Sequence, residues 1–205
     1  MVSPLASLKR GVLRPRDAEE IYVQPYAEFH RWEKEGVLLK VAHGYYALIP
    51  EASRGGHWRP SIEALALGIG QADYGRNDVA LMHLSAARIH ASIPRAIAVA
   101  VLAVPKQRPT LETIFGRIYF VKRKVGGLKR IRTETELGAG WVTSMEQTLL
   151  DIAKRPNLVD GMENVADEAV MSLNQRVDLK KTREIAEVQR MTSVFNRIEN
   201  WNTNA

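Results

Sequence analysis

The sequence predicts an α+β fold in two parts, a small N-terminal unit and a larger C-terminal unit of mixed helices and strands. Three observations carry this prediction. Within residues 1–50, short helical patterns bounded by proline and glycine precede a hairpin signal. Residues 51–60 are poor in apolar side chains and contain two glycines and a proline, which is typical of a linker. Residues 61–205 then alternate helical patterns with β-branched apolar runs.

The first unit contains three candidate helices. Pro4–Arg10 is a short one. In the next segment Pro15 can occupy a first helical turn, and the acidic residues after it suit a helix start. The third helix spans Gln24–Glu35 and ends before Gly36, a natural C-cap. Its Phe29 and Trp32 are spaced to face a core, which leaves a polar face on the opposite side.

A hairpin follows these helices, because Leu39–Leu48 contains two short β-type runs around His43-Gly44. Three helices and a hairpin are the order of a winged helix-turn-helix, whose third helix enters the DNA major groove while its wing lies beside the backbone. Small α+β units that bind protein have the same order, so both alternatives stay open. The side chains expected at DNA are Arg14, Arg16, Gln24, Tyr26, His30, Arg31, Lys34, Lys40 and His43.

In the second unit, helices are expected over Ser61–Ala72 and Asp78–His90. Ala96–Val104 is a continuous apolar run and predicts a strand buried on both faces. A capping-box pattern starting at Thr143, or one residue later at Ser144, predicts a further helix that ends before Pro156. The rest of the chain to Trp201 is helical in composition.

The positive charge is concentrated in the middle of the chain. The protein has a net charge of +6, yet residues 113–133 alone contain seven basic residues and no acidic one. Such a concentration predicts a surface that attracts phosphate or an acidic protein. Gly126-Gly127 lies between two short β-type runs here and predicts a β-hairpin with a tight turn. Solvated lysines on an ordinary hairpin are the alternative. The basic residues are Arg117, Lys122, Arg123, Lys124, Lys129, Arg130 and Arg132.

Composition excludes several classes of protein. There is no cysteine, and therefore no disulfide, thiolate catalysis or cysteine-bound zinc. The longest apolar run has nine residues, against about 20 for a membrane helix. No apolar signal core stands at the N-terminus, so a cytoplasmic protein without a membrane partner is expected.

No constellation for catalysis emerges from the sequence. A phosphate-binding glycine loop is missing, and His83 and His90 lie seven residues apart, roughly 10 Å along a helix and too far for one metal. Glu146 is better explained as a helix cap than as a catalytic group. We therefore expect a protein that is not an enzyme and uses no metal or cofactor.

Three segments, "HGYYALIP", "SAARIHASIPRAIAVAVLAVP" and "VTSMEQTLLDIAKRP", occur in an order that resembles the AbiEi-type antitoxins of type IV toxin–antitoxin systems. The resemblance implies a winged helix-turn-helix domain followed by a C-terminal α/β antitoxin domain. It also implies operator DNA and a nucleotidyltransferase-fold toxin as partners, with repression of the protein's own operon. The recognition helix would be Gln24–Glu35 and the wing Leu39–Leu48.

Two other functions stay open. The basic stretch could neutralise the toxin by direct docking on an acidic face, without sequence-specific DNA binding. The C-terminal unit could instead modify the toxin or its substrate, although the sequence offers no convincing active site for that.

Overall fold

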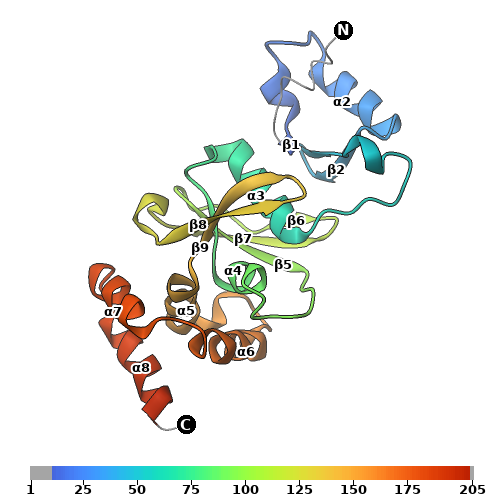
Figure 1. Ribbon diagram of the computed structural model, residues 1–205. Coiled ribbons are helices and arrows are strands. Elements are labelled where there is room, and N and C mark those ends of the chain that lie inside the picture. Colours follow the sequence, from blue (N-terminus) through green and yellow to red (C-terminus); the bar gives the residue numbers. More distant parts are fainter. Residues whose placement is uncertain (1–10, 204–205) are drawn as a thin grey trace.

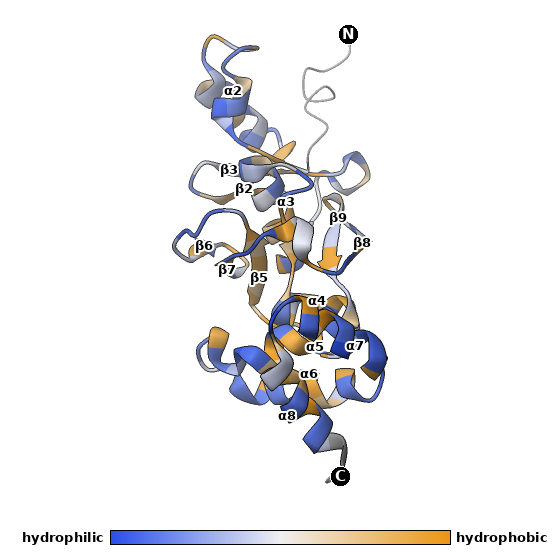
Figure 2. Ribbon diagram, turned by 90° about the vertical axis from the view of Figure 1, so that its left-hand side faces the viewer, coloured by the Kyte–Doolittle hydropathy of each residue, from blue (hydrophilic) through white to orange (hydrophobic). Residues whose placement is uncertain are grey.

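The computed structural model describes residues 11–203 and shows a mixed α/β protein with seven α-helices and two β-sheets in that part of the chain. The first sheet and helix α2 (Pro25–Lys34) lie at one end, and helices α7 (Leu179–Val188) and α8 (Thr192–Thr203) lie at the other. The larger sheet lies between them (Figures 1 and 2).

The N-terminal sheet is antiparallel, in the order β1-β3-β2. Its strands are β1 (Val12–Leu13), β2 (Leu38–Ala42) and β3 (Tyr45–Leu48). Helix α2 packs on this sheet through Phe29 and Trp32, as the sequence predicts. Both side chains are buried, and the Phe29 ring lies 5.2 Å from the Tyr46 ring. The β2–β3 hairpin turns at His43-Gly44, where the sequence places it.

The segment before α2 is less helical than expected. It forms β1 and then a 3₁₀ helix of four residues, η1 (Pro15–Ala18), with Pro15 in the first turn as predicted. Val12 and Leu13 are buried and pair with β3, so burial and strand pairing outweigh the local helix signals. The helix expected over Pro4–Arg10 lies outside the described residues.

The larger sheet has six strands in the order β6-β7-β5-β4-β9-β8. All six residues of β5 are buried, which confirms the strand predicted at this apolar run. The strands are β4 (Ala80–Leu81), β5 (Val99–Val104), β6 (Leu111–Thr113), β7 (Gly116–Lys122), β8 (Arg130–Thr135) and β9 (Gly138–Thr143).

Helices cover both faces of this sheet. Helix α3 (Ile62–Tyr74) packs on the face to which Ala100 and Leu102 of β5 contribute. Val99, Val101 and Ala103 face the other side. The helices on that side are α4 (His83–Ile89), α5 (Met145–Lys154), α6 (Glu163–Asn174), α7 and α8.

The hairpin predicted at Gly126-Gly127 is wrong. β7 is hydrogen-bonded to β5 on one side. On its other side Gly116–Ile118 pair with β6, and the Gln107 side chain is hydrogen-bonded to the backbone of Phe120 and Lys122, so β8 does not pair there. β8 pairs with β9 instead. The two glycines end a short 3₁₀ turn, η3 (Val125–Gly127), between the second and sixth strands of the sheet. Val125 and Leu128 are buried and fix this connection to the core.

The structure also differs from the predicted bounds of two helices. The predicted helix over Asp78–His90 begins only at His83, because Ala80 and Leu81 form β4 and fill the position between β5 and β9. Helix α5 begins at the second of the two proposed capping positions. The Ser144 hydroxyl accepts a hydrogen bond from the Gln147 backbone N–H at 3.3 Å.

The N-terminal sheet and the six-stranded sheet share one hydrophobic core. Val12, Val41 and Ala47 are buried in the same cluster as α3 and the inner strands of the larger sheet. A Cβ on Gly68 in α3 would lie 2.5 Å from the side chain of Val12, so α3 and β1 approach closely. Residues 51–60, the predicted linker, are mostly exposed and include a short 3₁₀ turn, η2 (Glu51–Ser53).

Candidate functional site

Helix α2 presents a polar face to solvent, and this face contains most of the side chains predicted to contact DNA. Gln24 is its N-cap, and Tyr26 follows in the first turn. Figure 2 shows α2 as a largely hydrophilic helix at the end of the molecule. The exposed predicted residues on and around it are Arg16, Gln24, Tyr26, His30, Arg31, Lys34, Lys40 and His43.

Carboxylates on the same helix neutralise part of this charge. The Arg31 guanidinium lies 2.6 Å from a Glu28 oxygen and 3.6 Å from a Glu35 oxygen. His30 Nδ1 lies 3.5 Å from Glu33. These exposed pairs contribute little to stability. They also weaken the attraction of α2 for anions such as phosphate.

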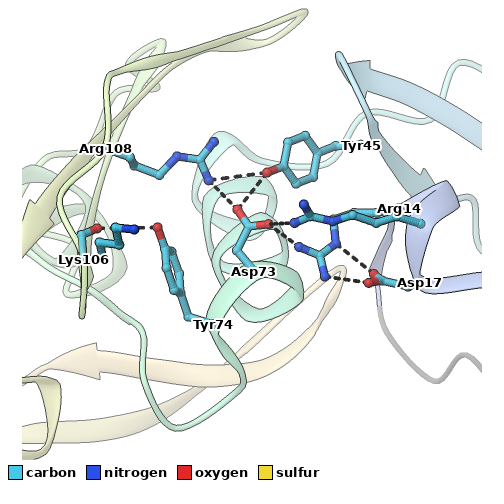
Figure 3. Close-up of polar contacts among 8 residues, drawn as sticks. Arg14, Asp17, Tyr45, Asp73, Tyr74, Lys106 and Arg108 are labelled. Atoms are coloured by element: carbon cyan, nitrogen blue, oxygen red, sulfur yellow. Dashed lines mark hydrogen bonds and ion pairs between the residues drawn. The ribbon is translucent and has the colours of Figure 1, made fainter.

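Arg14 does not join this surface, although the sequence analysis places it beside the DNA backbone. Its side chain is only 11% exposed and is held by two carboxylates, at 2.5 Å from Asp17 and 2.5 Å from Asp73. Figure 3 shows both pairs. The structure therefore counts against the prediction for Arg14, because a largely enclosed guanidinium paired with two carboxylates is poorly placed to contact phosphate.

Asp73, at the end of α3, is the centre of a polar cluster that connects the two sheets (Figure 3). Besides Arg14, its carboxylate accepts hydrogen bonds from the Tyr45 hydroxyl at 2.7 Å and from Arg108. Arg16 also pairs with Asp73, at 3.2 Å, but remains 60% exposed. Burial, with the bond to Asp73, raises the pKa of Tyr45. No sequence pattern indicates this cluster, since its members are up to 94 residues apart (Arg14 to Arg108).

The second predicted surface is divided between the ends of strands. Arg117 lies at the start of β7, and Lys122 lies at its end, roughly 16 Å away at about 3.3 Å per residue. The other predicted basic residues lie between Lys122 and Arg132, where β7 ends and β8 begins. The exposed members are Arg117, Lys122, Lys124, Lys129 and Arg132. We call Lys122, Lys124, Lys129 and Arg132 the basic surface.

Arg130 is engaged within the protein. Its guanidinium lies 4.4 Å from the centre of the Trp141 ring and donates a hydrogen bond to the Asn77 carbonyl at 2.7 Å. Arg132 lies 4.9 Å from the same ring but stays exposed. Trp141 thus holds two arginines close to each other at the edge of the sheet.

Arg123 is also engaged. It forms an ion pair with Asp151 at 2.8 Å, and the Asp151 side chain is fully buried. Burial raises the pKa of Asp151, against the opposing effect of Arg123. Gln189 accepts a second hydrogen bond from Arg123 at 3.2 Å. Arg123 is therefore a partner of a buried carboxylate rather than a surface cation.

A cavity of about 480 Å³ opens beside this ion pair. It is bounded by the 123–128 loop, by the C-terminal end of α5 and by the segment after α7. Lys154 and Arg155 add to its charge. Their sequence pattern does not indicate a site, because basic residues at a helix C-terminus are common. The lining residues are Met82, Val121, Lys122, Arg123, Lys124, Gly127, Leu128, Asp151, Lys154, Arg155, Leu158, Gln189 and Met191.

The histidines at the two ends of α4, His83 in its first turn and His90 at its C-cap, each bind a backbone carbonyl. His83 Nε2 lies 3.0 Å from the Arg155 carbonyl, and His90 Nε2 lies 2.7 Å from that of Thr143. Burial lowers the pKa of His83 to about 4, so its ring is neutral near pH 7. Across residues 11–203 no group of three histidine or acidic side chains is placed to hold a metal ion. No helix in that range is long and apolar enough to cross a membrane.

The sequence matches no family model, and no curated protein matches it either. Among solved structures, the chain is similar to the Rv2827c protein from Mycobacterium tuberculosis, with a TM-score of 0.52 and 16% identity over 96% of this chain and 78% of that one. At this level of identity, the similarity shows a shared fold and does not indicate a shared function. An antigenic nucleotidyltransferase-like protein from Paracoccidioides brasiliensis also aligns, over 67% of this chain and 95% of that one, at 12% identity. Its TM-score of 0.39 is too low to support an argument.

Proposed function

We propose that this protein is a DNA-binding antitoxin that represses its own operon and counteracts a nucleotidyltransferase-fold toxin. The observation that carries the DNA-binding part is the exposed polar face of α2, a helix held by buried Phe29 and Trp32 on a sheet that ends in a hairpin. A winged helix-turn-helix also places a polar recognition helix beside a hairpin, and this likeness supports the proposal. The antitoxin part rests on the order of the sequence motifs.

In the proposed complex, α2 enters the major groove and the β2–β3 hairpin lies beside it as the wing. Arg31 and Gln24 would contact base edges, since arginine and glutamine hydrogen-bond guanine and adenine with two bonds each. Lys40 and His43 are exposed on the hairpin and would contact phosphates. Arg31 would exchange its contacts with Glu28 and Glu35 for those with a base, which favours the correct sequence over random DNA.

The test is binding of the full chain to DNA from upstream of its own gene and to random DNA of equal length. We expect Arg31→Ala to reduce the preference for upstream DNA by about 1–3 kcal/mol, the usual value of a base contact with two hydrogen bonds. Gln24→Ala is expected to act in the same direction. Arg183→Ala is the matched control, because Arg183 is a helical arginine of similar exposure, paired with Glu199 at 2.5 Å. Full preference in both α2 variants would refute the role of this helix.

Direct docking of the toxin on the basic surface is the second candidate. It is favoured by Ile131, which is 49% exposed between Arg130 and Arg132. Arginine beside exposed apolar area is typical of protein interfaces. Co-purification of the toxin that survives Arg31→Ala and is lost in Arg132→Glu would support docking. Retention of the toxin by Arg132→Glu would count against it.

A further inference from the structure

Exposed apolar side chains gather at the start of α2. Ile21, Val23 and Tyr26 are 47%, 100% and 65% exposed. They are three of the ten large apolar side chains that are exposed in the described chain, and they lie within six residues, so this is not the scattered exposure of an ordinary surface. Ala27 is exposed beside them. A cluster of this kind is typical of a contact surface.

The exposed face of α2 changes character along the helix. Tyr26 and Ala27 lie in its first turn. One turn later, His30 and Arg31 take the same positions on this face, and Lys34 follows, because residues three and four apart lie on one side of a helix. The start of α2 thus presents apolar area, whereas its end presents polar groups. Figure 1 shows α2 at the outer end of the molecule, where both can meet one partner.

The start of α2 is not built to attract phosphate. Residues 19–28 contain three glutamates and no lysine, arginine or histidine. Electrostatic attraction to DNA phosphates requires lysine or arginine. In the proposed complex, the N-terminal residues of the recognition helix meet base edges instead. The major-groove edges of the four bases carry one apolar group, the C5 methyl of thymine. That methyl group is the part of DNA that an apolar start of α2 fits.

We propose that Val23 and Tyr26 contact thymine methyl groups in the major groove, which assigns A·T base pairs to the start of α2. This inference rests on the proposed function and names the bases that its recognition helix reads. Gln24 is the N-cap of α2 and directly follows Val23. A glutamine amide can bind adenine N6 and N7, while an apolar side chain contacts the thymine methyl group. Neighbouring residues would therefore read both bases of A·T pairs.

Uracil-substituted DNA tests the proposal, because uracil pairs with adenine as thymine does and lacks only the methyl group. The full chain is titrated with upstream DNA and with random DNA, each made with thymidine or with deoxyuridine, and binding is followed by fluorescence anisotropy. We expect uracil to weaken binding of upstream DNA about fourfold for each methyl group contacted, and to leave binding of random DNA unchanged. Val23→Ala should weaken binding of thymine-containing upstream DNA about fourfold and should respond less to uracil than the wild type does. Val188→Ala, at an exposed valine in α7, is the matched control and should behave as the wild type.

Val23 is fully exposed, so its replacement is expected to leave the fold intact. Equal affinity of the wild type for thymine and uracil upstream DNA, with the preference over random DNA retained, would overturn this inference and leave the proposed function standing. Equal affinity for upstream and random thymine DNA would refute both. A loss in Val23→Ala that is the same on thymine and uracil DNA would also overturn the inference, because Val23 would then contact something other than the methyl group, such as a second protein chain.

Discussion

Arg123 illustrates how neighbouring residues of one charged stretch acquire different roles. Sequence places it among seven similar cations, yet it is 24% exposed and paired with a fully buried carboxylate, while Lys122 and Lys124 on either side are exposed. Desolvation of Asp151 is tolerated only because Arg123 and Gln147 bind it. The position next to a buried acid therefore determines what Arg123 does.

This assignment predicts unequal effects on stability. Arg123→Ala would leave the Asp151 carboxylate buried without its cation, and we expect a loss of about 3 kcal/mol in the free energy of unfolding. Lys124→Ala changes an exposed side chain and should stay within about 0.5 kcal/mol of wild type. Urea denaturation followed by circular dichroism measures both. Equal stability of the two variants would mean that Arg123 is an ordinary surface cation.

At the scale of elements, the cluster around Asp73 connects a helix to two distant strands. Asp73 lies in the last turn of α3, Arg14 follows β1, and Tyr45 begins β3. The Asp73 side chain is only 7% exposed, so its hydrogen bonds are largely protected from water. Together with the core shared by Val12 and Gly68, the cluster fixes the N-terminal sheet on α3.

Asp73→Asn is expected to lower the free energy of unfolding by roughly 2–4 kcal/mol, because it removes the charge that compensates Arg14 and Arg108. Asp160→Asn is the control, since Asp160 is exposed. Differential scanning calorimetry measures the change. A transition temperature within the error of the control would show that the cluster does not hold these elements together.

Elements with strong local signals are the ones that sequence predicts correctly. α2 has proline at its start, glycine after its end and two aromatic side chains on one face, and β5 is an apolar run between prolines. The hairpin predicted at Gly126-Gly127 does not form, because β7 and β8 pair with other strands, β5 and β9, and a local pattern does not show which strands will pair. β4 was not predicted, because a strand of two residues has too short a pattern to be recognised in the sequence.

The candidate site also combines features that the sequence predicts with features that depend on distant residues. Exposure of the polar residues of α2 follows from the position of its two aromatic residues, so sequence could predict it. Burial of Arg14 depends on Asp73, which is 59 residues away. The cavity combines Lys154 and Arg155 with a loop about 30 residues earlier in the chain, and no local pattern contains that information.

For the whole molecule, the proposed function assigns recognition of the DNA sequence to one surface and electrostatic attraction for DNA phosphates to another. Residues 1–50 contain seven basic and six acidic side chains, so the N-terminal unit itself adds little attraction for phosphate. The excess positive charge lies in residues 113–133, the stretch that contains the basic surface and forms β7 and most of β8 in the larger sheet. On DNA that contacts both α2 and the basic surface, α2 would recognise the sequence and the basic surface would add electrostatic attraction for phosphates.

The most direct test of this division is the salt dependence of DNA binding by a variant in which Lys122, Lys124, Lys129 and Arg132 are glutamine. Each phosphate contact contributes about 0.9 to the slope of log affinity against log salt, so four lost contacts would flatten it by about 3.6. We expect the flatter slope together with an unchanged preference for upstream over random DNA. A slope equal to that of wild type, or a lost preference, would show that α2 and the basic surface do not divide these two roles.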